Sequence, residues 1–207
     1  MSAIAQPKDK TPTFETGSLL ETKRTRVETF APRGSPIYLP TGIEESEKFE
    51  DKYSNKNIIA ISNVIADKQL KYIYIGNNTN IRNLDFLRFQ VDTLEELHLP
   101  NCSKLSDISS LGRLKKLKVL NLRGCSSITS QALKILRECP ILKVLSICEC
   151  YQLESLDFLI GMDLEYFSLR GLQKLNDLSP IGSNINLMEL RLMNVLIPIK
   201  KIHKKIL

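Results

Sequence analysis

The sequence predicts an α/β solenoid, in which short coils form a right-handed stack with one parallel strand per coil. The first observation is a repeated apolar pattern, L-x-x-L-x-L-x-x-C, which begins at Leu117 and again 25 residues later at Leu142. The second is the alternation of leucines within each copy, which is typical of a strand with one buried face. The third is a further apolar pair that ends each copy, such as Leu133 with Leu136. A constant period in the twenties indicates units that bury their apolar faces only against their neighbours.

The same template extends in both directions from this central pair. Successive copies begin 24, 23, 25, 22 and 23 residues apart. Such regular spacing predicts about six units, which begin at Leu70, Leu94, Leu117, Leu142, Leu164 and Leu187. Residues 70–207 are therefore assigned to the repeats, with a short basic stretch at the C-terminal end.

Each unit is expected to follow the same course. The two leucines of x-L-x-L-x point inward, and the intervening residues point outward onto the concave face of a parallel sheet. In the first four units an Asn or Cys three positions after the second leucine, such as Asn78 or Cys125, turns the chain, whereas the last two units depart from this rule with Leu172 and Val195. On the return side, residues 126–140 have room for two or three turns of α-helix. The other return segments contain Gly or Pro and favour short 3₁₀ pieces.

These features resemble those of leucine-rich-repeat proteins over about residues 70–199. Residues 117–150, which contain GCSSIT, ECP and CEC, are similar to the cysteine-containing branch known from F-box-type adaptors. The units around LSDISSLGRLKKLKVLNL are similar to the short-helix branch of phosphatase regulators, splicing-complex subunits, an axonemal dynein light chain and protozoan repeat proteins. The resemblance implies a leucine-rich-repeat solenoid with a parallel concave sheet and short helical or 3₁₀ convex segments. It also implies a binding role, and it brings no catalytic residue with it.

Two segments precede the repeats. Residues 1–45 contain five of the nine prolines. We expect them to form an extended or disordered N-terminal arm, because such a composition buries too little apolar surface to offset the entropy lost on ordering. Residues 46–69 have the length of one repeat without its pattern, and we expect them to form an N-terminal cap, part strand or part helix, over the open end of the core.

Composition and motifs argue against several classes of function. The chain has 207 residues, a formal net charge of +6 and no run of 18 apolar residues, so we expect no membrane association. The first residues lack the apolar core of a secretory signal, which favours an intracellular, cytoplasmic location, with the cytoskeleton, an axoneme or the nucleus left open. The two histidines have no Cys or Ser at a catalytic spacing, and neither phosphate loops nor metal motifs occur. We therefore expect no enzyme activity, no cofactor, no metal site and no small-molecule substrate.

The five cysteines are expected to have structural roles. Cys102, Cys125 and Cys150 occupy the same repeat position, which predicts that their thiols stack inside the core about 5 Å apart. Cys139 is expected to be buried, and Cys148 lies on the outer face of its strand. An odd number of cysteines also fits reduced, unpaired thiols.

The outward strand positions form the candidate partner-binding surface. Tyr and Arg, which are enriched in binding hot spots, occur at these positions, whereas Lys does not. Arg123, Arg170 and Arg191 form a stripe toward the C-terminal end. The predicted partner-binding residues are Tyr72, Tyr74, Glu96, His98, Asn121, Arg123, Ser146, Tyr166, Ser168, Arg170, Glu189 and Arg191.

Together these patterns predict a non-catalytic protein-interaction scaffold, or a subunit of a larger intracellular assembly such as a cytoskeletal or axonemal complex. Protein partners would bind through the concave face and the N-terminal arm. Two alternatives are open. Arg and Tyr on a sheet also bind RNA, so the chain could be a ribonucleoprotein subunit. The resemblance of residues 117–150 would also fit a substrate adaptor of a ubiquitin ligase.

Overall fold

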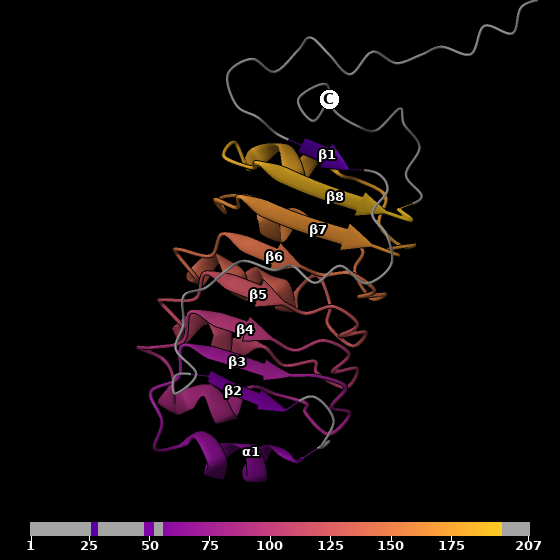
Figure 1. Ribbon diagram of the computed structural model, residues 1–207. Helices are drawn as coiled ribbons and strands as arrows, with labels where there is room; N and C mark the ends of the chain where they lie inside the picture. The colour runs from indigo at the N-terminus through magenta and orange to yellow at the C-terminus, as the bar shows by residue number, and fades with distance from the viewer. Residues whose placement is uncertain (1–25, 29–47, 52–55, 196–207) are drawn as a thin grey trace, which may run out of the picture.

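One parallel sheet runs along the whole molecule and is backed by short helices (Figure 1). The computed structural model describes residues 26–28, 48–51 and 56–195. The sheet order is β1-β8-β7-β6-β5-β4-β3-β2, so the strands from β2 to β8 lie side by side in chain order. This architecture confirms the predicted leucine-rich-repeat solenoid. The strands are β1 Arg26–Glu28, β2 Lys48–Asp51, β3 Tyr72–Ile75, β4 Glu96–His98, β5 Val119–Asn121, β6 Val144–Ser146, β7 Tyr166–Arg170 and β8 Glu189–Met193.

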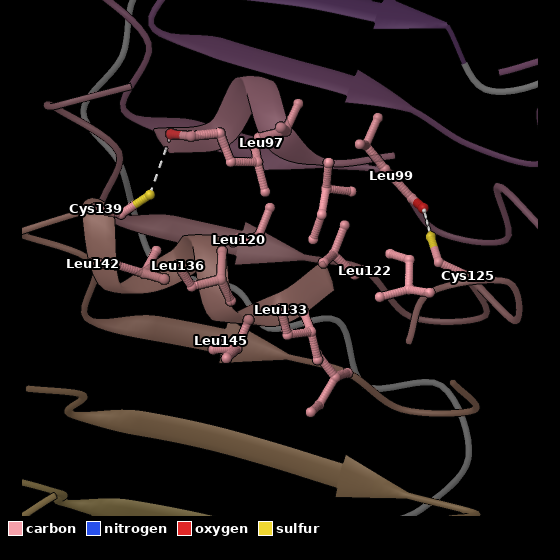
Figure 2. Close-up of a cluster of buried hydrophobic side chains, with 14 of the residues drawn as sticks. Leu97, Leu99, Leu120, Leu122, Cys125, Leu133, Leu136, Cys139, Leu142 and Leu145 are labelled. Atoms are coloured by element: carbon pink, nitrogen blue, oxygen red, sulfur yellow. Dashed lines mark hydrogen bonds between the residues drawn. The ribbon is translucent and has the colours of Figure 1, made fainter. Parts of the chain in front are cut away.

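The interior is a continuous column of apolar side chains. One residue near the start of each strand from β3 to β8 is the register partner of its equivalent in the next strand, and each is at most 1% exposed. Figure 2 shows Leu97, Leu120 and Leu145 stacked in this way, with Leu133 and Leu136 close by. Burying each such side chain contributes about 1.5–3 kcal/mol. The column consists of Ile73, Leu97, Leu120, Leu145, Phe167 and Leu190.

Short 3₁₀ helices form the return sides of five coils. The α-helix expected within residues 126–140 is wrong, because the structure has a 3₁₀ helix there. Leu133 and Leu136 are three residues apart, the spacing that places side chains on one side of a 3₁₀ helix, and both are fully buried. An α-helical stripe would next use Arg137, which is exposed. The 3₁₀ helices are η2 Asp85–Phe89, η3 Ser109–Arg113, η4 Ala132–Glu138, η5 Asp157–Leu159 and η6 Ser179–Ser183.

Buried thiols satisfy backbone carbonyls between neighbouring coils. Cys125 Sγ donates to the carbonyl oxygen of Leu99 at 3.1 Å (Figure 2). Cys150 makes the equivalent contact one coil later, at 3.2 Å. In the first unit Asn78 takes this place, and its Oδ1 accepts from the backbone N–H groups two and three residues further on. The shared repeat position therefore has one structural role, which is to hold the turn after the strand.

Two buried amides that the sequence pattern does not predict close individual coils. Gln90 Oε1 accepts from the Leu70 N–H at 2.9 Å, and its Nε2 donates to the carbonyl oxygen of Ile65 at 2.9 Å. Asn184 Oδ1 accepts from the Leu164 N–H at 3.1 Å in the fifth unit. Each amide therefore joins the first residue of a unit to the end of the same unit.

Every strand from β3 to β8 is followed by a residue with left-handed backbone, seven places after the start of its unit. Gly and Asn adopt this conformation at the least cost. Five of the six positions hold one of these two residues, and Glu149 is the exception. The φ values lie between 52° and 73° at Asn77, Asn101, Gly124, Glu149, Gly171 and Asn194.

The N-terminal end of the stack is formed by β2 and by helix α1, Ile58–Ile65. β2 pairs in parallel with β3. α1 buries Ile61 and Ile65 against the core, and the side chain of Asn57 accepts from the Ala60 N–H at 2.9 Å to cap the helix. The segment expected to act as a cap, residues 46–69, thus supplies one strand and one helix.

The opposite edge of the sheet is formed by β1, which pairs in parallel with β8. Both edges are therefore made by residues that precede the repeats (Figure 1). Of the expected arm, residues 1–45, only residues 26–28 lie among the described residues, and the basic stretch after residue 195 lies outside them. The register partners are Arg26 with Glu189, Val27 with Leu190 and Glu28 with Arg191.

Candidate interaction face

The outward side of the sheet, here called the concave face, carries rows of side chains that alternate with the buried column. Arg123 and Arg170 lie in a third row near the strand ends, and the repeat position places Cys148 between them. The first row contains Tyr72, Glu96, Val119, Val144, Tyr166 and Glu189, and the second contains Tyr74, His98, Asn121, Ser146, Ser168 and Arg191.

Three rings cluster at the N-terminal end of the concave face. The His98 ring centroid lies 5.1 Å from that of Tyr72 and 6.2 Å from that of Tyr74. Glu96 Oε2 lies 3.4 Å from His98 Nε2, and both residues are only 7% exposed. The ring contacts and the contact between Glu96 and His98 restrict these side chains before any partner binds, which lowers the entropy cost of recognition.

Small side chains fill the middle of the concave face. Ser146 is 3% exposed, Ser168 is 7% exposed and Cys148 is 7% exposed. The Cys148 Sγ lies 3.3 Å from Ser168 Oγ. Side chains this short do not extend as far from the sheet as the larger side chains on neighbouring strands, which lie about 4.8 Å away. Two of the predicted binding residues, Ser146 and Ser168, are therefore buried at the base of the concave face. The two clusters of larger side chains lie toward the two ends of the face.

Tyr166, Glu189 and Arg191 form a connected cluster near the C-terminal end. Arg191 Nε donates to Glu189 Oε1 at 2.7 Å, and its guanidinium lies 5.4 Å from the centroid of the Tyr166 ring. Burial raises the pKa of Tyr166 to about 12. The phenol therefore stays neutral near pH 7 and keeps its ability to donate a hydrogen bond.

Glu149 contacts the other two arginines of the concave face, Arg123 and Arg170. The sequence pattern did not identify it as a functional residue. Its Oε1 lies 3.6 Å from Arg123 Nη2 and 3.6 Å from Arg170 Nε. Its φ of 60° is a conformation that costs most side chains about 1–2 kcal/mol. Backbone strain of this kind is concentrated at functional sites. The signal that could have revealed it is an acidic residue at a repeat position that otherwise holds Asn or Gly.

A hollow of about 430 Å³ opens beside Glu149, at the carboxyl ends of β6, β7 and β8. Its lining exposes polar and apolar surface in nearly equal amounts, and the charged groups in it belong to Glu149 and Arg170. Within the described ranges, no group of three or more His, Cys, Asp and Glu residues could hold a metal ion. The hollow is lined by Glu149, Tyr151, Arg170, Gly171, Gln173 and Asn194.

Burial makes the core thiols poor nucleophiles. It raises the pKa of Cys102 and of Cys139 to about 11 and that of Cys150 to about 12. The pKa of Cys125 is also raised well above its ordinary value, because a thiolate is disfavoured in an apolar interior. These thiols therefore remain protonated at neutral pH and serve the fold.

Fold and face together define the class: a leucine-rich-repeat solenoid with an outward-facing parallel sheet. Among solved structures, internalin C2 from Listeria monocytogenes is similar, with a TM-score of 0.59 and 24% sequence identity over 73% of this chain and 63% of that chain. A second internalin from the same organism gives a TM-score of 0.41 at 24% identity, over 62% of this chain and 49% of that chain. This chain thus spans less than two thirds of the length of either internalin, and the likeness to internalin C2 shows the fold alone. No family model and no curated protein matches the sequence.

No helix in the described part of the chain has the length and apolarity needed to cross a lipid bilayer.

Proposed function

We propose that the protein is a non-catalytic scaffold or a subunit of a larger intracellular assembly, and that it holds a protein partner on the concave face. The observation that carries this proposal is the pre-arranged aromatic and charged surface. Tyr72 and Tyr74 contact His98 at one end, and Tyr166 lies under Arg191 at the other. Rigid aromatic side chains supply contact area at little entropy cost, which suits protein recognition.

The charge of the concave face favours a protein partner over RNA. Affinity for nucleic acid depends mainly on an excess of cationic groups near the phosphates. Here the three arginines are matched by three glutamates, so a polyanion gains little net attraction. The charged residues counted are Arg123, Arg170, Arg191, Glu96, Glu149 and Glu189.

The cellular setting is the finer part of the proposal. A cytoplasmic assembly, such as a cytoskeletal or axonemal complex, is supported by the resemblance of the short-helix repeats around residues 105–122. The N-terminal arm would add to the binding surface. The ubiquitin-ligase alternative is supported only by the resemblance of residues 117–150, and no feature of the concave face favours it.

Capture of partners from native lysate tests the proposal with matched surface variants. The double variant Tyr72→Ser with Tyr166→Ser should lose at least about tenfold of the captured partner, because truncated aromatic hot spots cost about 2 kcal/mol or more. The control, Ile59→Ser with Phe89→Ser, removes exposed apolar side chains from α1 and η2. It should capture the same partner at the wild-type level. If the concave-face variant retains the partner at an unchanged melting temperature, the concave face is not the binding surface.

A further inference from the structure

Two arginines of the concave face share a single carboxylate. Arg123 belongs to the coil before Glu149, and Arg170 belongs to the coil after it. Both lie 3.6 Å from the same oxygen, Oε1 of Glu149. Guanidinium–carboxylate hydrogen bonds are usually about 2.7–2.9 Å long. The contacts are therefore loose ion pairs, and most of the hydrogen-bonding capacity of the two guanidiniums is left for another group.

Arg123 carries a second sign of an incomplete site. Its Nε is buried, and no acceptor within the described ranges forms a hydrogen bond with it. Buried donors are nearly always paired in folded proteins, so an orphan on a charged side chain calls for a reason. An acceptor supplied by a bound partner would satisfy it once the Arg123 side chain has moved to expose the Nε.

The residue that lies between the two arginines in the repeat register has a small side chain. Cys148 lies between them in the repeat register and is only 7% exposed, next to the equally buried Ser168. Arg170 and Glu149 also line the hollow at the carboxyl ends of β6, β7 and β8. A side chain from a partner could therefore approach both guanidiniums once Glu149 moves.

The backbone of Glu149 is also strained. It holds a left-handed backbone that Gly or Asn holds in the other five units. A strained residue that persists at a functional site indicates a role other than stability. Here the role open to it is to neutralise Arg123 and Arg170 in the absence of a partner.

We propose that Arg123 and Arg170 form a clamp for a carboxylate carried by an extended protein segment, and that Glu149 occupies the clamp until that carboxylate displaces it. This inference rests on the proposed function and specifies the chemistry of its partner. The planar donors of arginine suit a carboxylate. Two guanidiniums lie beside one carboxylate whether Glu149 or the partner supplies it, so the clamp suits a single acidic residue rather than a polyanion, whose affinity needs a larger excess of cationic groups.

An NMR titration of the full chain tests the clamp, with Arg Nε–Hε signals as the readout. The probes are the peptide acetyl-Gly-Tyr-Glu-Tyr-Gly-amide, its Gln counterpart and its phosphoserine counterpart. The Glu peptide should shift the Arg123 and Arg170 signals and bind at least about tenfold more tightly than the Gln peptide, as expected for a charged hydrogen bond. It should also bind more tightly than the phosphoserine peptide.

Variants of Glu149 and Arg170 should change the affinity for the Glu peptide in opposite directions. Glu149→Gln removes the competing carboxylate and should tighten binding of the Glu peptide about tenfold. Arg170→Gln should abolish binding. Arg170→Lys keeps the charge without the planar donors and should weaken it, which preserves the test if the Gln variant does not fold. The matched control is Arg113→Gln, an exposed arginine on η3, which should leave binding unchanged.

Several outcomes would overturn the clamp: equal binding of the Glu and Gln peptides, no shift at the solubility limit of the Glu peptide, or tighter binding of the phosphoserine peptide. An unchanged affinity in Arg170→Gln or in Glu149→Gln would do so as well. If the clamp fails in this way while the Tyr72 and Tyr166 variant still loses its captured partner, the concave face remains the binding surface and only the carboxylate is wrong.

Discussion

Leu120 shows how much one residue of the buried column contributes. It is fully buried, and its register partners on either side are Leu97 and Leu145. Leu120→Ala should lower the free energy of unfolding by about 2–5 kcal/mol, because it leaves a cavity in a packed interior. Urea denaturation measures this. Ile59→Ala is the control, since that side chain is 68% exposed on α1, and it should change stability by less than about 0.5 kcal/mol. Equal losses in both variants would contradict a single shared interior.

The buried thiols predict a loss of stability in alkali. Their pKa values of about 11 to 12 in the folded protein exceed the ordinary value of 9.0, so the unfolded chain releases these protons first. Their contribution is complete below about pH 9 and is lost as the pH rises toward 11 to 12. Each thiol adds a slope of about 1.4 kcal/mol per pH unit once it is ionised in the unfolded state.

Urea denaturation between about pH 8 and about pH 10.5 measures this slope. The double variant Cys125→Ala with Cys150→Ala should show a flatter decline than the wild type, because it removes two of the groups that titrate. Identical slopes would mean that other groups, such as the tyrosines, cause the decline.

For single residues, the sequence predicted the face of the sheet on which a side chain lies better than it predicted how exposed that side chain is. Alternation within each strand correctly placed Ser146 and Ser168 on the side opposite the leucines, and it could not show that both are buried there. It also identified Arg123 and Arg170 without their shared partner Glu149. Burial and pairing depend on the sizes and charges of residues in neighbouring coils, which lie more than 20 positions away in the sequence.

The turn after each strand is the element whose backbone can be tested most directly. A Cβ at Gly124 would clash with the side-chain oxygen of Asn101 and lie 3.1 Å from its Cα, at a φ of +73°. Gly161 follows η5 and serves as the comparison: its φ is +85°, and no atom lies within 4 Å of an added Cβ. Gly161→Ala should cost about 1–2 kcal/mol for the left-handed backbone alone. Gly124→Ala should cost clearly more, because it adds a steric clash between two coils.

Thermal or chemical unfolding of the two glycine variants gives the comparison. The difference in their free energies of unfolding reports the close approach of the turns at Asn101 and Gly124. A larger loss for Gly161→Ala would contradict the turn geometry described here.

Strands could be predicted from the sequence and return segments could be predicted only in part. Each unit that contains a strand from β3 to β8 has two inward apolar residues at fixed positions, whereas η4 has only Leu133 and Leu136, whose spacing fits either helix type. The choice between them depends on how the coil packs against its neighbours. The amide bonds of Gln90 and Asn184 lie outside the apolar template, so counting apolar positions could not reveal them.

For the whole molecule, closure of the sheet edge by β1 has a measurable effect. Deletion of residues 1–28 removes β1 and leaves the edge of β8 unpaired. The variant should melt at a lower temperature and should self-associate, because unpaired strand edges recruit other strands. Calorimetry and analytical ultracentrifugation measure the two effects. Deletion of residues 1–25 keeps β1 and should have the smaller effect on both; equal effects would show that pairing of β1 with β8 does not contribute.

The number and order of the repeats could be read from the sequence, and the closure of the sheet could not. Six periodic units define six of the eight described strands, β3 to β8, and β2 lies in the segment expected to act as a cap. β1 has three residues and no periodic context, so its partner strand depends on complementarity across the fold. The register of β1 on β8, which pairs Arg26 with Glu189 and Glu28 with Arg191, is known only from the structure.

The pairing of β1 with β8 sets an order of events during biosynthesis. Val27 and Leu190 are register partners 163 residues apart. Translation runs from the N-terminus, so the earlier coils can fold while the ribosome is still adding the later ones. The acceptor edge for β1 is synthesised after the strands from β2 to β7, so β1 must wait for all of these coils before it can dock.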